Sequence, residues 1–358
     1  MAATATGVYH TSYASELRLR RTGAERFRLL LIGVALLALP WTVNTYWLGI
    51  VNTIGIAVIG AVGLNILVGF TGQISLGQGG FLAVGAFTSA LLVQRAGLPL
   101  PLAMIAAVLV TAAVGAFFGL PALRLKGLYL AIATIASQEI IIFVVRRWQW
   151  LTGGQGFIDV DRLTLFGYRI PRASFEFAWY WIIAGLAVLA VLSARNLFRT
   201  ALGRSFMAVR DQDIAASAIG VDLTRTKLVA FAVSSGYVGL AGALTAHYTE
   251  TVTWERFTID VSIQYLAMII VGGLGSIAGA VYGAAFIMLL PPLLAELAGR
   301  VRTWAPFVAD QLPAVQVATF GLVILLFLLF EPRGLDRIWR RAKDYFRYWP
   351  FRYQEDNP

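Results

Sequence analysis

Residues 195–227 have the sequence RNLFRTALGRSFMAVRDQDIAASAIGVDLTRTK and lie between two long apolar segments. The segment carries six basic and three acidic residues, and its middle part is rich in alanine. Small side chains on a short helix let a second surface approach closely, and the flanking charges favour water over lipid. The segment therefore predicts a water-exposed docking element on a membrane protein. An ordinary solvated loop helix is the simpler alternative.

The composition of the whole chain agrees with a membrane protein. Hydrophobic residues make up 58% of the sequence and charged residues 13%, whereas a soluble domain carries about 25% charged residues. Repeated apolar runs approach roughly 20 residues, the length that a helix needs to cross a bilayer. The expected fold class is all-α, a polytopic inner-membrane helical bundle with about 8–10 transmembrane helices and glycine-rich broken or re-entrant segments.

Several classes of function are disfavoured by the sequence. There is no cysteine, and the two histidines are too few for a histidine-based metal centre. No G-x-x-x-x-G-K-[ST] motif occurs, so the chain does not bind ATP in the P-loop manner. The sequence contains no pair of carboxylates and no nucleophile–base spacing that would indicate a catalytic site. We expect neither an enzyme nor a bound metal or cofactor. If ATP powers the activity of this protein, a separate chain would bind it.

Ten apolar segments follow one another along the chain. They are residues 29–47, 48–70, 74–93, 100–120, 128–145, 177–194, 228–248, 263–271, 277–290 and 312–330. We expect three parts: a cytosolic basic arm (1–28), a transmembrane domain (29–331) and a cytosolic basic tail (332–358). The transmembrane domain includes the docking element at 195–227, called the docking loop, and a long outer loop at 146–176. A cleaved signal peptide is a weaker alternative for the first segment, because the arm is long and no small-x-small site follows.

The distribution of basic residues predicts the orientation. Of the 29 Lys and Arg residues, 20 fall in the arm, in residues 121–127, in the docking loop or in the tail. Since basic residues favour the cytosolic side, both termini are expected in the cytosol. The turn at 272–276 has no charge. If it reaches the cytosol there are ten spans, and if residues 263–290 are broken or re-entrant there are eight or nine.

Two glycine-rich segments resemble each other, GFTGQISLGQGG at 69–80 and GGLGSIAGAVYGA at 272–284. Glycine allows helices to pack closely, and it also allows a broken helix whose backbone groups meet a polar solute. Both uses remain open. The expectation is that the two segments face each other, or a partner, near a translocation path. The candidates for that path in and near these segments are Asn65, Gln73, Ser75, Gly77, Gln78, Gly273, Gly275 and Ser276.

Glu139 is the only acidic residue inside a predicted span. A lone carboxylate within a membrane is costly and usually faces a cavity or a partner, so Glu139 is a further candidate for the path. A structural hydrogen bond to Gln138 or to a neighbouring helix is the alternative.

Three stretches carry a family resemblance. They are GLNILVGFTGQISLGQGGFLAVGAF at 63–87, LTGGQGF at 151–157 and GVDLTRTKLVAFAVSSGYVGLAGAL at 220–244. They resemble the LivM-like permeases of the branched-chain amino-acid ABC importer family. The resemblance covers roughly residues 53–334 and leaves out the arm and the tail.

The docking loop carries a second resemblance. Its spacing Ala215-Ala216-x-x-x-Gly220 is similar to the EAA loop of ABC importer permeases, which seats in a cleft of the cytosolic ATPase. The acidic residue of that pattern is replaced by Ile214, and the nearest acid is Asp213. The residues that this resemblance implicates in ATPase coupling are Gly203, Arg204, Ala208, Arg210, Asp213, Ala215, Ala216 and Gly220.

The resemblance implies a plasma (inner) membrane, multi-pass permease subunit that translocates branched-chain or other hydrophobic amino acids. Its implied partners are a second homologous permease, two cytosolic ATPases that use ATP, an extracytoplasmic solute-binding protein and membrane lipid, but no nucleic acid. A urea or short-amide permease of the same family remains an alternative. An ion-coupled secondary transporter is the alternative of another class, although it requires several buried titratable groups and Glu139 stands alone.

Overall fold

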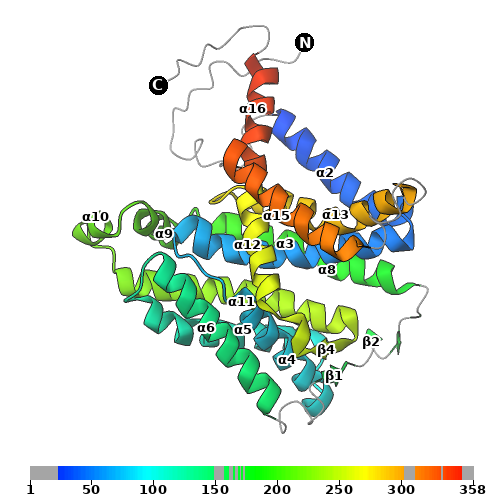
Figure 1. Cartoon of the computed structure of the whole chain (residues 1–358), viewed down its shortest axis with the longest axis horizontal. Helices are drawn as coiled ribbons and strands as arrows, with labels where there is room; N and C mark the ends of the chain where they lie inside the picture. Colours follow the sequence, from blue (N-terminus) through cyan, green and yellow to red (C-terminus); the bar gives the residue numbers. More distant parts are fainter. Residues whose placement is uncertain are drawn as a thin grey trace.

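The computed structural model describes residues 23–148, 157–160, 164–165, 168–169, 171, 174–301, 311–331 and 334–348. Residues 1–22 of the predicted arm, most of the LTGGQGF motif and residues 349–358 lie outside the described part. Within it, long helices dominate and three of the four short strands lie in the 146–176 loop region (Figure 1). The prediction of an all-α, multi-span helical bundle is confirmed.

The helices are numbered in chain order. They are α2 (Gly23–Thr42), α3 (Thr45–Thr71), α4 (Gln78–Ala96), α5 (Leu100–Ala122), α6 (Leu128–Arg147), α8 (Phe175–Leu197), α9 (Ala201–Asp211), α10 (Asp213–Ala218), α11 (Leu223–Thr249), α12 (Ile259–Gly272), α13 (Ile277–Val301), α15 (Leu312–Phe330) and α16 (Gly334–Tyr348). The 3-10 helix η2 covers Trp254–Arg256. The strands are β1 (Phe157–Asp159), β2 (Thr164–Leu165), β3 (Tyr168–Arg169) and β4 (Thr251–Thr253).

Seven helices of the described part are long and apolar enough to cross a membrane, or eight if α15 and α16 count as one bent span. The seven are α3, α4, α5, α6, α8, α11 and α13. The first predicted span, 29–47, is divided differently from the expectation, because α2 ends at Thr42 and α3 begins at Thr45. Asn44 has an extended backbone there, which interrupts the helix.

Helix α3 is the central column of the bundle. Every residue from Ile56 to Thr71 is buried, and α3 packs against α8, α11, α12 and α13. Its sequence is apolar on all sides, and a helix of this kind is stable only when other helices surround it. The apolar sequence of α3 therefore fits its interior position, and α4, α5 and α6 lie on the far side of α11 from it (Figure 1).

Helix α11 packs against α4 and α5 through small residues. A Cβ atom added to Gly239 would lie 2.5 Å from Thr111 Oγ1 of α5, and one added to Gly85 would collide with the carbonyl oxygen of Gly239. Without side chains at these positions, the helix backbones approach each other closely, which is how helices associate in a membrane.

Within the region 263–290, helix α12 is a broken span, whereas α13 is a full-length candidate span. Helix α12 has 14 residues, which gives a length of about 21 Å, short of the hydrocarbon core of about 30 Å. The turn that follows contains Gly273 and Gly275, with φ angles of 118° and 75°. Only glycine adopts such angles without strain. A Cβ atom on Gly279 would lie 2.6 Å from the carbonyl oxygen of Gly272, so α13 turns back tightly against α12.

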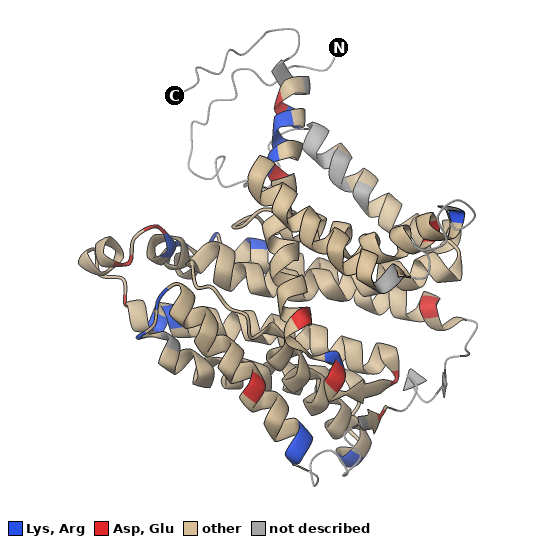
Figure 2. Ribbon diagram, viewed as in Figure 1, with Lys and Arg blue, Asp and Glu red and all other residues tan. Residues whose placement is uncertain are grey.

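The two ends of the bundle differ. Helices α9 and α10 lie at one end, and β1, β2 and β4 lie at the opposite end (Figure 1). Strand β1 pairs with β4 in antiparallel register. Charged residues gather mostly at the helix ends and in the connecting segments (Figure 2). The docking loop and the long loop after α6 therefore lie at opposite ends, and the tail contains a further helix, α16, which the sequence analysis did not predict.

The close contact of α4 with α11 predicts the effect of a side chain at Gly85. We expect Gly85→Leu to lower the stability of the protein by about 1–3 kcal/mol or more, because an overpacked core must distort. Gly185→Ala on α8 is the matched control, since a Cβ atom there meets nothing within 4 Å. Thermal unfolding in detergent, followed by size exclusion, measures both. Equal melting temperatures for the two variants would contradict the close packing of α4 on α11.

Candidate functional site

The docking loop forms two short helices rather than one. Helix α9 begins after Thr200, whose side chain accepts a hydrogen bond from the backbone N–H of Gly203 at 3.3 Å. This cap satisfies one free donor at the start of the helix. Gln212 has an extended backbone, with φ −162° and ψ 110°, and separates α9 from α10. The predicted docking element is therefore a helix–turn–helix at one end of the bundle.

The two helices present different residues to the protein and to solvent. Gly203, Phe206 and Ala216 are buried against the bundle, whereas Arg204, Ala215 and Gly220 are exposed. Ala208 is half-buried. Ile214 and Ile219 on or beside α10 are 74% and 78% exposed. The exposed large apolar side chains of the loop are these two isoleucines, which the sequence analysis did not select, and Ala216 is turned inward.

Asp213 anchors α10 to the rest of the chain. It forms an ion pair with Lys126, and Lys227 Nζ lies 4.0 Å from its Oδ2 atom. The hydrogen bond from Lys126 holds the pKa of Asp213 below its usual value. The carboxylate therefore stays ionised well into the acidic range, and its contribution to stability disappears only as the pH falls through this lowered pKa.

A cavity of about 460 Å³ lies between the docking loop, the end of α3 and the start of α6. Its lining includes Gln73, Lys126, Arg210, Asp213 and Lys227. Gln73 is 4% exposed, and its side-chain amide has no hydrogen-bond partner among the described residues. The structure thus brings one predicted path residue next to two predicted coupling residues.

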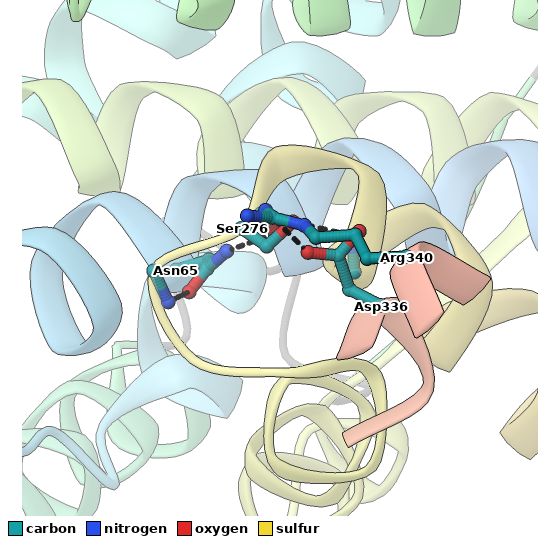
Figure 3. Close-up of polar contacts among 6 residues, drawn as sticks. Asn65, Ser276, Asp336 and Arg340 are labelled. Atoms are coloured by element: carbon teal, nitrogen blue, oxygen red, sulfur yellow. Dashed lines mark hydrogen bonds and ion pairs between the residues drawn. The ribbon is translucent and has the colours of Figure 1, made fainter. Parts of the chain in front are cut away.

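Asn65 of α3 holds the turn between α12 and α13. Its Nδ2 atom donates to the carbonyl oxygen of Ser276 at 2.7 Å, and its Oδ1 atom accepts from the backbone N–H of Gly275 at 3.0 Å. Figure 3 shows Asn65 and Ser276 at this turn, with Asp336 and Arg340 of α16 beside it. A buried amide that satisfies two backbone groups fixes both the position and the orientation of the turn.

Arg210 lies between the two glycine-rich segments. A Cβ atom on Gly275 would lie 2.5 Å from Arg210 Nη1, and a Cβ atom on Gly72 would lie 3.5 Å from Arg210 Cα. A Cβ atom on Gly275 would also lie 3.1 Å from the carbonyl oxygen of Gly69. One residue of the docking loop therefore lies beside both segments where they approach each other.

The other residues of the first glycine-rich segment are used for packing between helices. Gln78 donates to the carbonyl oxygen of Gly60 at 3.1 Å. Gly77 approaches the carbonyl oxygen of Thr134 in α6, since a Cβ atom would lie 2.7 Å from it. Ser75 is buried at 1% exposure and Gly273 is buried in the second segment. None of Ser75, Gly77 and Gln78 forms a hydrogen bond with Asn65 or Ser276 in the described part of the chain.

Glu139 faces outward from α6. It is exposed together with Ile132, Ile140 and Phe143, and it has no hydrogen bond or ion pair with any residue that the structure describes. The neighbouring Gln138 is the buried one, and it accepts from Ser262 Oγ at 2.6 Å. The predicted alternative, a hydrogen bond from Gln138 to Glu139, is therefore not formed.

A second polar cluster at the opposite end escaped the sequence analysis. Glu176 Oε2 accepts from Tyr248 Oη at 2.7 Å and from Asn52 Nδ2 at 2.8 Å. The three residues come from α8, α11 and α3, so no local spacing signals the cluster. It ties these helices together near β4.

Comparison with known proteins agrees with the fold. The family model described as "Branched-chain amino acid transport system / permease component" matches residues 46–330. The chain is 32% identical to the high-affinity branched-chain amino acid transport system permease protein LivM of Salmonella typhimurium, over 76% of this chain and 65% of that protein. It is 30% identical to LivM of Escherichia coli, over 86% of this chain and 74% of that protein.

More distant relatives are named as permeases for a different solute. The autoinducer 2 import system permease protein LsrC of Salmonella paratyphi B is 26% identical, over 70% of this chain and 68% of that protein. The chain spans just under two thirds of the length of the Salmonella typhimurium LivM protein. No solved structure matches it. The relatives are transport permeases rather than enzymes, and the chain belongs to the branched-chain amino acid transport permease family.

Proposed function

We propose that this chain is the membrane-spanning permease subunit of an ABC importer for branched-chain or other hydrophobic amino acids. An extracytoplasmic binding protein would deliver the solute, and two separate ATPases would use ATP on the cytosolic side. The observation that carries the proposal is the docking loop, whose Arg210 contacts both glycine-rich segments. Family membership and the LivM relatives support it.

The exposed side of α10 supports an ATPase as the docking partner. Ile214 and Ile219 are the two exposed large apolar side chains of the docking loop, all of which the structure describes. An apolar side chain on a water-exposed surface is stabilised when another protein covers it. The Lys126–Asp213 ion pair fixes α10 to the turn before α6, so a force on the isoleucines reaches the bundle.

The positions of Arg210 and Asn65 would couple movement of the docking loop to the glycine-rich segments. Movement of α9 displaces Arg210, which lies against Gly72 and Gly275. The turn at Gly275 is tied to α3 through Asn65, so the broken span and the central helix respond together. Both segments offer backbone groups and amides without a fixed charge, which suits weak binding of a solute that must leave again.

The exposed face of α6 supports a second permease. A carboxylate at membrane depth costs about 2.5–3.5 kcal/mol on insertion scales unless a partner or water meets it. Glu139 lies near the middle of α6, and no described residue of this chain meets it. A homologous permease that presents a hydrogen-bond donor or a cation to this face would satisfy the carboxylate.

The cargo, the membrane and the orientation are part of the proposal. LsrC relatives are named for autoinducer 2 import, so the fold alone does not fix the solute, and a urea or short-amide cargo is the alternative within the family. An ion-coupled transporter is disfavoured, since Glu139 is the only acidic residue inside a span predicted from the sequence. The distribution of basic residues supports an inner-membrane protein with both termini in the cytosol.

The docking proposal predicts the effect of charge on α10. We expect the double variant Ile214→Asp, Ile219→Asp to lower amino-acid uptake at least tenfold, because each substitution replaces an apolar contact with a carboxylate that would be desolvated on docking. The ATPases should no longer co-purify, whereas the permease should remain in the membrane at its normal amount. The measurements are uptake into vesicles and recovery of the complex in mild detergent.

The matched control is Ile214→Leu, Ile219→Leu, which keeps an apolar surface of similar volume and should retain uptake. Normal ATPase recovery with the aspartate variant would rule out α10 as the docking surface.

The second-permease proposal predicts different results for two substitutions of Glu139. Glu139→Gln keeps a hydrogen-bonding group and should retain most of the assembly with the second permease. Glu139→Leu removes that group and should lower both recovery of the permease pair and uptake by about tenfold, as expected for loss of a partnered buried polar group. Phe143→Leu on the same face is the control for altered packing.

Co-purification of the two permeases and uptake are the measurements. If Glu139 faced lipid, Glu139→Leu would raise the yield of the protein and leave uptake unchanged, and the proposal would be wrong.

A further inference from the structure

Helix α16 has two chemically distinct sides. Its sequence is GLDRIWRRAKDYFRY. At 3.6 residues per turn, one side carries the apolar and aromatic residues Leu335, Ile338, Trp339, Ala342 and Tyr345. The other side carries Asp336, Arg337, Arg340, Arg341, Lys343 and Asp344. A helix with an apolar face and a basic polar face is typical of helices that lie in a membrane interface.

The position of α16 fits such a role. Helix α15 has 19 residues and is therefore about 28 Å long, close to the thickness of the hydrocarbon core. Helix α16 follows after a break and is bent by 51° from α15. In Figure 1 it runs across the direction of α3 and α8. It begins where the span before it ends, and it does not continue that span.

The start of α16 is fixed against the broken span. Gly334 has a φ angle of 71°, and a Cβ atom there would lie 2.5 Å from the backbone nitrogen of Gly273. Trp339 packs against Tyr282 of α13, with ring centroids 6.4 Å apart. These contacts place α16 at the end of the bundle where Arg210 meets Gly275.

The apolar side of α16 is only partly covered by the chain. Ile338, Trp339 and Tyr345 remain 45%, 58% and 65% exposed. Trp and Tyr are enriched at the boundary between lipid and water, where the ring lies in an apolar region and its polar atom reaches water. Lipid at this boundary would cover all three side chains without any further protein.

The charged side offers donors for a phosphate group. Arg340 Nη2 lies 2.5 Å from the nearly buried Asp336, and Arg341 Nη1 lies 3.2 Å from Glu331. Both guanidinium groups are more than half exposed, and each has five N–H donors, more than one carboxylate uses. Lys343 has no ion pair with any residue in the described part of the chain.

We propose that α16 lies in the membrane interface at the docking-loop end and binds the headgroups of anionic phospholipids through Arg340, Arg341 and Lys343. Its apolar side enters the boundary of the acyl chains. Because Gly334 is in contact with Gly273, the lipid site lies directly beside the turn that Asn65 holds. This inference does not depend on the cargo or on the ATPases.

The orientation of α16 is testable because the chain contains no cysteine. Single variants Ile338→Cys, Tyr345→Cys and Lys343→Cys of the full chain, spin-labelled in lipid nanodiscs, report contact with oxygen and with a water-soluble nickel chelate. We expect oxygen contact and nickel protection at 338 and 345, and the reverse at 343. Nickel contact at all three positions would overturn the proposal. It would also be overturned if positions 338 and 345 became protected only after ATPases were added to the nanodiscs.

The headgroup preference is tested with nanodiscs that contain phosphatidylcholine alone or mixed with phosphatidylglycerol. Native mass spectrometry of the released protein counts the bound phosphatidylglycerol. Each basic residue near an anionic surface contributes about fivefold to binding, so Arg340→Gln, Arg341→Gln, Lys343→Gln should lower the bound phosphatidylglycerol at least fivefold. Lys343→Gln alone breaks no recorded ion pair and should give a smaller loss in the same direction.

The matched control is Arg300→Gln at the end of α13. Arg300 is 74% exposed and pairs with Glu296 at i,i+4 spacing, as Arg340 pairs with Asp336. It should leave the bound phosphatidylglycerol unchanged. An equal loss in the control, or no preference of the unmodified protein for phosphatidylglycerol, would overturn the proposed headgroup site.

Discussion

The side-chain amide of Asn65 is the contact on which the functional end of the structure depends. The end of a helix leaves backbone donors and acceptors without helical partners. Asn65 supplies one donor and one acceptor to the turn between α12 and α13. Leaving two such part-buried groups unpaired would cost about 1–3 kcal/mol each, so this side chain stabilises the turn where α12 ends.

Glycines around the Asn65 contact allow neighbouring elements to pack directly against it. A Cβ atom on Gly69 would collide with Asn65 and Gly275, and one on Gly334 would lie 2.7 Å from the carbonyl carbon of Gly272. Since these positions lack side chains, α3 and α16 each come within backbone contact of the turn. Arg210 fills the remaining side of the turn. Four segments that are distant in the sequence therefore share one small volume.

Much of this architecture follows from local sequence patterns. Apolar length predicts the spans, full apolarity predicts that α3 is central, and the polar island at 195–227 predicts water-exposed helices at the bundle end. These signals depend on composition and periodicity, which a single chain displays directly. The uncharged turn at 272–276 left two outcomes open, two complete spans or a broken segment, and composition alone did not decide between them.

The contacts between segments were not predictable in this way. Asn65 and Ser276 are 211 positions apart, and nothing near Asn65 indicates its partner. Glu139 and Gln138 are adjacent in sequence, yet a rotation of about 100° between consecutive helix positions buries the amide and exposes the carboxylate. Ala216 is buried and Ile214 exposed for the same reason. Helix α16 escaped prediction because its charged residues dominate the composition of the tail, although its apolar positions follow the helical period.

Hydrogen exchange at the turn tests the central claim most directly. Exchange of the backbone amides at residues 273–276 is compared between the unmodified protein and Asn65→Leu, in the same detergent, with α5 as an internal reference. If Asn65 holds the turn, the variant should exchange at least fivefold faster at these amides, as the cost of about 1–3 kcal/mol for an unpaired group implies, while α5 remains unchanged. Equal exchange rates at residues 273–276 in the two proteins would show that other contacts hold the broken span and would contradict the account.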